Sequence, residues 1–214
     1  MVDVRPAGRT ALLATFDSLD DVVAFRAGLR ATAVPGLTEV VSGARTLLLR
    51  FDPDRTDAAR LGTTLARVTP VSAGSSAASA ADGASVTPLV VPVTYDGADL
   101  DVVASATGMT RAELVAWHTG HVWTSAFCGF APGFSYLTGT APSLDVPRRT
   151  TSRTAVPSGA VALAGEFSAV YPRSSPGGWQ LIGRTEVPMW SLDRDPPALA
   201  PAGTRLRFVE ARPA

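Results

Sequence analysis

Lysine is absent from this 214-residue chain, in which all 19 cationic side chains are arginine. A phosphate-binding P-loop, Schiff-base chemistry, Ser–Lys catalysis and the attachment of biotin all require a lysine. The chain therefore cannot perform these functions alone, and we expect no biotin on it. The arginines can still bind a carboxylate or a phosphate through two parallel hydrogen bonds.

An excess of charge and paired cysteines are missing as well. The 19 cationic side chains balance 19 anionic ones and the isoelectric point is near 6.7, which argues against nucleic acid or an anionic membrane as a partner. Cys128 is the single cysteine, so an internal disulfide and a thiolate zinc site are both excluded. Because Cys128 lies in an apolar run without cationic neighbours, we expect it to be buried and unreactive.

Long hydrophobic runs are also lacking. The longest, such as "PLVVPV", fall far short of the roughly 18 residues that a membrane helix needs. The start, "MVDVRPAGRT", carries Asp3 where a signal peptide would have cations followed by a long apolar run. These features predict a soluble cytoplasmic protein.

Hydrophobic periodicity in the first 70 residues predicts the order β-α-β-β-α. A strand is expected over 10–16, followed by a helix capped by Asp17 or Ser18, a hairpin around Ser42–Gly43, and a second amphipathic helix over 54–68. This order is typical of a small ferredoxin-like α+β unit, which a later strand could complete. The segment has no histidine and no cluster of polar side chains, so we assign it a structural or docking role.

The segment 71–86 is rich in Ala, Ser and Gly and is expected to be a linker between a domain over 1–85 and another over 87–214. The second domain begins with a strand and two short helices. Many short β-type runs separated by turn residues follow from His121 onward, and they predict a barrel or a sandwich.

His118 and His121 are the only histidines, three positions apart at a predicted helix end. Without a third ligand, this spacing is weak support for a metal, and we predict none. A helix carboxyl end with anions nearby can hold imidazolium near neutral pH, which makes His118 a candidate general acid or base. The alternative is a histidine that only caps helix carbonyls.

A polar loop before a Pro-Ser-Gly turn, "VPRRTTSRTAVPSGAV", carries Arg148, Arg149 and Arg153. Arginines presented together on a loop suit a carboxylate or the phosphates of ATP. Solvated arginines without a ligand are the alternative.

Two runs, "FCGFAPGFSYLTG" and "YPRSSPGGWQLIGRT", place large rings beside glycines. Glycine suits positive φ angles and close backbone approach, so we expect both runs to form ligand walls, although a hairpin that leads a core tryptophan into a strand would look alike. Gln180 could bind an amide-like ligand. The predicted pocket-shaping residues are Gly129, Phe130, Pro132, Gly133, Phe134, Pro157, Gly159, Pro176, Gly177, Gly178 and Trp179.

The runs "GFAPGFSYL", "PRRTTSRTAVPSGAV", "SPGGWQLIGRT" and "DRDPPALAPAGTRLRF" closely resemble the KipI/PxpB family, whose members are labelled as 5-oxoprolinase subunits of type B or as allophanate hydrolase subunit 1. The resemblance implies an N-terminal ferredoxin-like α+β domain followed by a cyclophilin-like β-barrel. It also implies a non-autonomous subunit that works with a homologous barrel protein, PxpC or allophanate hydrolase subunit 2, and with a LamB/YcsF (PxpA) type hydrolase.

The activity implied is the ATP-dependent opening of 5-oxoproline to glutamate, with ATP and Mg²⁺ shared with the partner. On this hypothesis His118 transfers a proton and Gln180 binds the amide. Phosphate or carboxylate would be bound by Tyr136, Arg148, Arg153 and Arg184. The alternative functions are a KipI-like inhibitor of a sensor histidine kinase and, by fold analogy alone, a prolyl isomerase.

Overall fold

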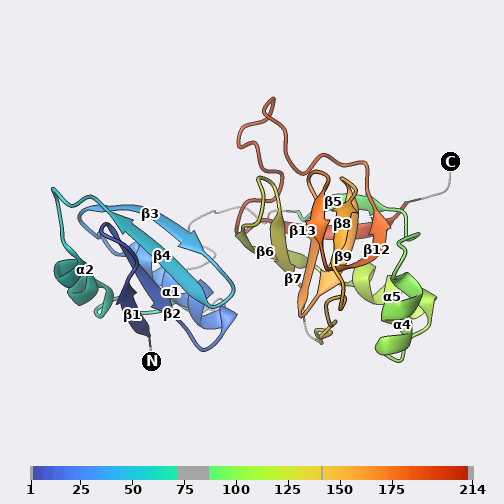
Figure 1. Cartoon of the computed structure of the whole chain (residues 1–214), viewed down its shortest axis with the longest axis horizontal. Helices are drawn as coiled ribbons and strands as arrows, with labels where there is room; N and C mark the ends of the chain where they lie inside the picture. Colours follow the sequence, from blue (N-terminus) through green and yellow to red (C-terminus); the bar gives the residue numbers. More distant parts are fainter. Residues whose placement is uncertain (1, 72–86, 141, 212–214) are drawn as a thin grey trace. The chain divides into compact units, whose positions relative to one another are not determined.

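The computed structural model describes residues 2–71, 87–140 and 142–211 of the chain (Figure 1). The chain divides into two compact units, Met1–Ser85 and Val86–Ala214, which are described separately below. The predicted linker lies, from residue 72 onward, outside the described residues. Among the helices of the described ranges, none is long and apolar enough to cross a membrane.

In its described residues, 2–71, the first unit is a four-stranded antiparallel sheet in the order β1-β2-β4-β3, with two helices. Its elements are β1 (Asp3–Pro6), β2 (Ala11–Thr15), α1 (Leu19–Ala31), β3 (Leu37–Ser42), β4 (Thr46–Phe51) and α2 (Ala58–Leu65). One face of the sheet packs with both helices. The core consists of Leu12, Ala14, Leu47 and Leu49 from the sheet, Val22, Phe25 and Leu29 from α1, and Leu61 and Leu65 from α2, with Phe16, Phe51 and Val68.

Helices α1 and α2 each begin with a side-chain cap, as predicted at Ser18 for α1, whereas α2 begins four residues after the start of the expected range 54–68. Ser18 Oγ accepts the N–H of Asp21 at 3.1 Å before α1, and Asp57 Oδ1 accepts the N–H of Arg60 at 2.9 Å before α2. Each bond satisfies one of the amide groups that a helix start leaves without a partner.

The ferredoxin-like arrangement is not found in its ordinary chain order. The predicted β-α-β-β-α order is present as β2 to α2, but β1, which precedes it, occupies the sheet edge beside β2 with Asp3 opposite Thr15. The later strands of the described ranges pair within other sheets. An amino-terminal hairpin thus takes the place that a later strand was expected to fill.

The second unit contains a seven-stranded sheet in the order β12-β9-β10-β7-β6-β13-β5. Thr94, just after β5, exchanges two backbone hydrogen bonds of 2.8 and 2.9 Å with Arg184 of β12, which nearly closes the sheet into a barrel. Its strands are β5 (Leu89–Val93), β6 (Trp123–Cys128), β7 (Ser135–Thr138), β9 (Ala160–Ala164), β10 (Phe167–Val170), β12 (Gln180–Arg184) and β13 (Arg205–Glu210), and β8 (Arg153–Val156) pairs separately with β11 (Ser175–Gly177).

The two helices of this unit, α4 (Leu100–Ala106) and α5 (Arg111–Gly120), lie together at one side of the barrel (Figure 1). A capping box starts α5, because the side chains of Thr110 and Glu113 each accept the other's backbone N–H.

Strand β9 is buried on both faces and separates two cores. Val161 and Leu163 belong to the core that includes the helices, whereas Ala160, Ala162 and Ala164 belong to a second core with aromatic side chains. The small alanine side chains leave room for large rings on that face, which is where the candidate site begins.

Candidate functional site

The aromatic residues of the two glycine-rich runs meet in one cluster. Phe127 stacks on Tyr136 with ring centroids 4.3 Å apart. Phe134 contacts Tyr136, Tyr171 and Trp179 edge-on at 5.1, 5.2 and 5.5 Å. Residues distant in sequence therefore build a single aromatic wall. The stacked and edge-on contacts in it are the arrangements that aromatic pairs commonly adopt.

Glycine is required at two points of this wall. A Cβ on Gly177 would lie 2.3 Å from the hydroxyl of Tyr171, and one on Gly133, whose φ is +79°, would lie 2.8 Å from Cβ of Trp190. Phe130 also has a positive φ of 66°, a conformation that is strained for a large side chain, and its ring is 61% exposed. The backbone in "GFAPGF" therefore places the Phe130 ring at the surface, whereas the Phe134 ring is buried.

Arg148 lies over the indole of Trp179, with its guanidinium carbon 5.9 Å from the ring centroid. The side chain is exposed, and no acidic side chain pairs with it within the described ranges. A guanidinium over an aromatic face with no anion of its own is able to bind one.

Arg149 and Arg153, in contrast, are held by Asp99, a residue that the sequence analysis did not select. Arg149 Nη1 and Arg153 Nη2 each donate to Asp99 Oδ1 at 2.8 Å, and the N–H of Leu181 donates to Oδ2 at 2.7 Å. Burial alone would raise the pKa of Asp99, but the hydrogen bonds from Arg153 and Leu181 and the charges of Arg153 and Arg149 outweigh it and hold the pKa below its usual value. Asp99 is therefore ionised at neutral pH.

Two polar atoms beside this network have no hydrogen-bond partner. Gln180 donates from Nε2 to the carbonyl of Pro147 at 3.0 Å, but its Oε1 is buried and unpaired. Nη1 of Arg153 is likewise buried without a partner. Buried polar atoms are normally paired, so an unpaired donor and an unpaired acceptor in one network mark a place where a ligand could complete the bonding.

Tyr136 and Tyr171 complete the polar side of the wall. Burial raises the pKa of both phenols, although the nearby charge of Arg148 opposes the shift. Both therefore remain protonated at neutral pH. Asp99 is paired with Arg149 and Arg153, and Arg148 over Trp179 adds a third guanidinium group, so these side chains together carry net positive charge and favour an anion.

The expectation that His118 is an imidazolium general acid or base is wrong. The ring is fully buried and stacked on Phe208 at 4.4 Å, and its nitrogens lie 2.7 Å from the hydroxyl of Tyr95 and 2.9 Å from that of Ser168. Burial first, and then the charge of His121, lower the pKa of His118 to about 3. A neutral imidazole offers one donor and one acceptor, which suits a structural link inside the core.

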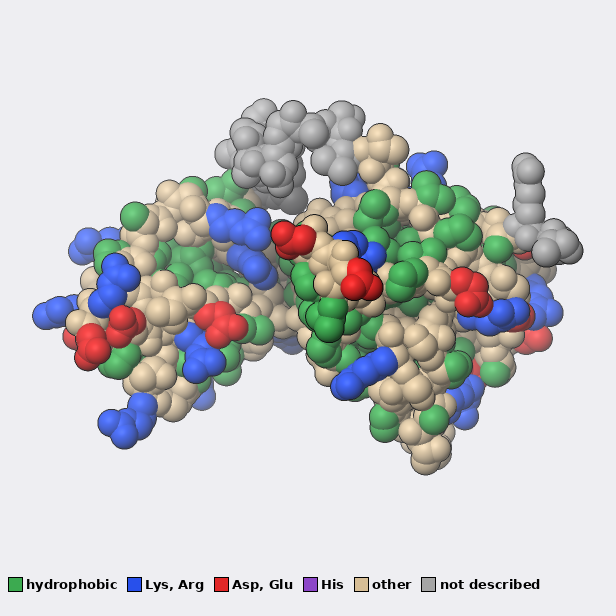
Figure 2. Space-filling model, turned by 90° about the horizontal axis from the view of Figure 1, so that it is seen from above, with side chains coloured by type: hydrophobic (Ala, Val, Ile, Leu, Met, Phe, Trp, Pro, Cys, Tyr) green, Lys and Arg blue, Asp and Glu red, His purple; other side chains and the backbone are tan. Residues whose placement is uncertain are grey.

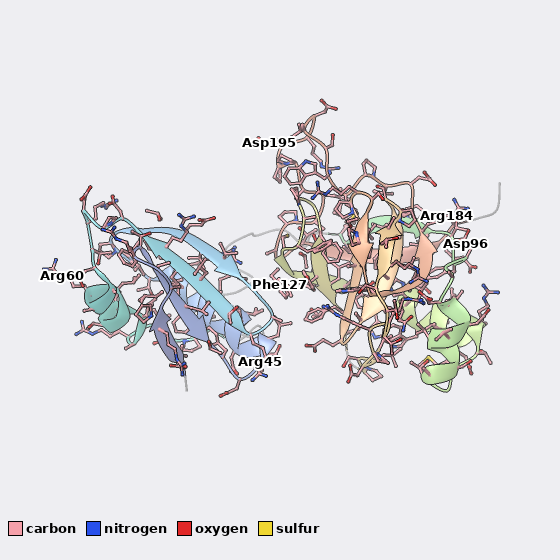
Figure 3. All side chains as sticks on the ribbon, in the orientation of Figure 1. Arg45, Arg60, Asp96, Phe127, Arg184 and Asp195 are labelled. Carbon is pink, nitrogen blue, oxygen red and sulfur yellow. The ribbon has the colours of Figure 1, made fainter. Side chains whose placement is uncertain are left out.

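Arg184 also lies away from the cluster. Its Nε donates to Asp96 at 2.9 Å and its Nη1 lies 3.5 Å from Glu186. Figure 3 shows Arg184 and Asp96 side by side, across the barrel unit from Phe127. The expectation that Arg184 joins the other arginines is therefore not met by the geometry.

Cys128 is half-buried rather than buried, because strand β6 alternates and directs Phe127 inward and Cys128 outward. Its Sγ lies 3.6 Å from the carbonyl oxygen of Ala200 and 3.7 Å from Oγ of Ser135.

The remaining predicted pocket residues divide between two places. Pro157 precedes a turn in which Gly159, with a φ of +81°, lines a cavity of about 240 Å³ together with Tyr171, Thr185 and Trp190. Figure 2 shows hydrophobic side chains gathered over the end of this unit from which the loop 186–200 projects in Figure 1. Trp190 and Leu192 of that loop, and Phe130, are among the exposed large apolar residues of the unit. Gly129, Pro132 and Gly178 lie in the loops next to the aromatic wall, and Pro176 lies in strand β11.

Comparison with known proteins identifies the family. The profile described as carboxyltransferase domain, subdomain C and D, matches residues 2–200. The chain belongs to this family. Its resemblance to the KipI/PxpB group is confirmed by curated relatives named as 5-oxoprolinase subunits of type B, with 42% identity over 122 residues in Escherichia coli O157:H7 and 38% over 122 residues in Bacillus subtilis. These matches cover 56% of this chain in both cases, and 56% and 51% of the respective relatives, so the matched part spans about half the length of the curated relatives.

Solved structures agree on the fold of this carboxyltransferase-type chain. The protein TTHA0988 is 31% identical with a TM-score of 0.73, over 99% of this chain and 41% of its own. Urea amidolyase of Kluyveromyces lactis superposes with a TM-score of 0.73 over 98% of this chain and 15% of its own, at 17% identity, and shows similarity of fold alone. In both structures the superposed region is part of a much longer chain.

Proposed function

We propose that this chain is one subunit of an ATP-dependent 5-oxoprolinase complex, in which a homologous barrel protein and a LamB/YcsF-type hydrolase are the other subunits. The observation that carries the proposal is the 38–42% identity to proteins named as 5-oxoprolinase subunits of type B. The positively charged aromatic site described above supports it, because 5-oxoproline carries a carboxylate and ATP carries phosphates.

The chemistry explains why ATP is needed. A lactam carbonyl is a poor electrophile, and transfer of the γ-phosphoryl group of ATP to its oxygen, with release of ADP, turns that oxygen into a leaving group. Attack of water on the carbonyl carbon and cleavage of the ring C–N bond then give γ-glutamyl phosphate, and a second water hydrolyses this acyl phosphate to glutamate and phosphate. This chain would contribute binding and charge stabilisation rather than the nucleophile.

Within this proposal, Arg148 binds a carboxylate or phosphate oxygen above Trp179, and Arg153 and Gln180 offer their unpaired atoms to the amide. The residues present therefore fit an anionic ligand. The described ranges contain no group of three or more His, Cys, Asp or Glu side chains placed to hold a metal ion. We assign Mg²⁺ to the nucleotide phosphates and the partner subunit.

The proposal is tested by measuring ATP turnover and glutamate formation from 5-oxoproline with the chain alone, with the barrel partner, and with both partners. We expect turnover only when all three proteins are present. Full turnover by the lone chain, or none with all partners, would contradict it. The kinase-inhibitor alternative has no support from the names of the relatives, and stoichiometric inhibition of kinase autophosphorylation without any lactam turnover would favour it instead.

In the complete complex, we expect Arg148→Met to lower kcat/KM for 5-oxoproline about 10- to 100-fold, because a hydrogen bond to a charged group contributes about 1.5–3 kcal/mol. Methionine preserves the apolar cover over Trp179 but removes the charge. Arg111→Met is the matched control, since Arg111 forms an exposed ion pair with Asp101 on the helices. Equal kinetics for the two variants would exclude Arg148 from the site.

A further inference from the structure

Asp99 occupies the N-cap position of α4, yet its carboxylate makes no capping hydrogen bond to that helix. The side chain is 3% exposed, and both oxygens point instead toward the arginine loop and strand β12. Its backbone N–H also donates to the carbonyl of Leu181 at 2.9 Å, while Leu181 N–H donates back to the carboxylate at 2.7 Å. A buried carboxylate needs hydrogen-bond partners, and because Asp99 does not cap its own helix, its partners lie outside that helix.

Those partners carry the candidate site. Two guanidinium groups that would repel each other both donate to one oxygen of Asp99, which holds Arg149 and Arg153 side by side. Leu181, bound through its amide, directly follows Gln180. Two of the residues with unpaired buried atoms are thus close to this carboxylate: Arg153 donates to it directly, and Gln180 precedes the residue whose amide donates to it.

The backbone around Asp99 joins the same elements. Arg149 N–H donates to the carbonyl of Gly178 at 2.8 Å, and Arg153 is opposite Gly177 in the β8–β11 pair. The arginine loop and the Gly-Gly-Trp turn are therefore linked to each other by backbone hydrogen bonds and to α4 through Asp99.

We propose that Asp99 is a positioning residue, which holds Arg149 and Arg153 in the orientation in which the site binds an anion. The inference builds on the proposed function but concerns the site itself. A positioning role also predicts that loss of the Asp99 carboxylate weakens anion binding, which is the opposite of what net charge alone predicts. Removing a negative charge from a positive site should strengthen anion binding by Coulomb attraction, whereas loss of orientation should weaken it.

The test uses Asp99→Asn, which keeps the shape and an oxygen that can accept the Leu181 amide. Inorganic phosphate is titrated into the full chain, with tryptophan fluorescence as the signal because Trp179 forms part of the wall. We expect the dissociation constant for phosphate to rise at least about tenfold, the usual effect of removing a group that orients a binding residue. Asp96→Asn, which breaks the exposed ion pair with Arg184, is the matched control and should bind as wild type does.

Weaker binding by Asp99→Asn alone supports the inference. Tighter or unchanged binding, equal weakening in Asp96→Asn, or no phosphate binding by the wild-type chain overturns it. In the complete complex, Asp99→Asn should raise KM for 5-oxoproline with a smaller change in kcat. A wild-type complex without 5-oxoproline turnover refutes the proposed function, while the phosphate titration still decides the role of Asp99. A variant that fails to fold is replaced by Asp99→Glu, for which weaker phosphate binding than wild type is again expected, because the longer side chain displaces the arginines.

Discussion

The Gly97→Ala variant is expected to lose at least about 3 kcal/mol of the free energy of unfolding of the second unit, because the added atom has only backbone to displace. A Cβ at Gly97 would lie 2.3 Å from the carbonyl oxygen of Leu181, 2.3 Å from the carbonyl carbon of Ile182 and 2.5 Å from the nitrogen of Gly183. To avoid these clashes, α4 would have to move away from β12, and this movement would also break the two hydrogen bonds between Asp99 and Leu181.

Tryptophan fluorescence during urea unfolding measures this effect in the second unit alone. The chain has four tryptophans, all of them in this unit: Trp117, Trp123, Trp179 and Trp190. Gly120→Ala is the matched control, since a Cβ there meets no atom within 4 Å, and its urea midpoint should equal that of the wild type or exceed it slightly. A Gly97→Ala midpoint within error of the control would show that the contact between Gly97 and β12 relaxes at no cost.

Local signals predicted the elements of the first unit well. The helix start at Ser18 and the hairpin around Ser42–Gly43 each depend on side chains within a few residues of one another, whereas the second helix begins after Asp57, inside the expected range 54–68. Such interactions are local, so a short stretch of sequence contains all the residues that make them.

Strand pairing was harder to predict, because partners in a sheet can be distant in sequence. β1 lies before the predicted unit and pairs with β2, and β13 pairs in parallel with β5 across more than 100 residues of chain. A one-residue shift in register exchanges the two faces of a strand, so the alternation of Phe127 and Cys128 did not reveal which of them faces inward.

For the site residues too, local features could be predicted from the sequence and contacts between distant segments could not. Composition identified the arginine loop and the two glycine-rich aromatic runs, because glycine beside a large ring is uncommon without a structural reason. It missed Asp99, which looks like an ordinary acidic residue before a short helix, since its burial depends on a loop 50 residues later. His118 was misassigned for the same reason: its position at a helix end is visible in the sequence, but the stacking on Phe208 is not.

The buried histidine leads to a second large effect, the loss of stability in acid. The pKa of His118 is lowered to about 3 in the folded chain, mainly by burial, against 6.5 for a free histidine. Between these values the unfolded chain binds a proton that the folded chain does not. The stabilisation that comes from keeping His118 neutral is therefore complete above pH 6.5. Below pH 6.5 the free energy of unfolding should fall by about 1.4 kcal/mol for each pH unit, or about 2–3 kcal/mol by pH 4.5.

Replacement of His118 by glutamine separates this titration from packing. His118→Gln loses the ring stacked on Phe208 and should be less stable at pH 8 by about 2–4 kcal/mol, but its stability should depend much less on pH from 6.5 to 4.5. His121→Gln is the matched control. It removes the second cause of the lowered His118 pKa but leaves burial, the first cause, in place, so the free energy of unfolding should keep most of its dependence on pH. If the free energy of unfolding of His118→Gln depends on pH as steeply as that of the wild type, the imidazole must reach solvent when it takes up its proton. An acid-base role for His118 would then be restored.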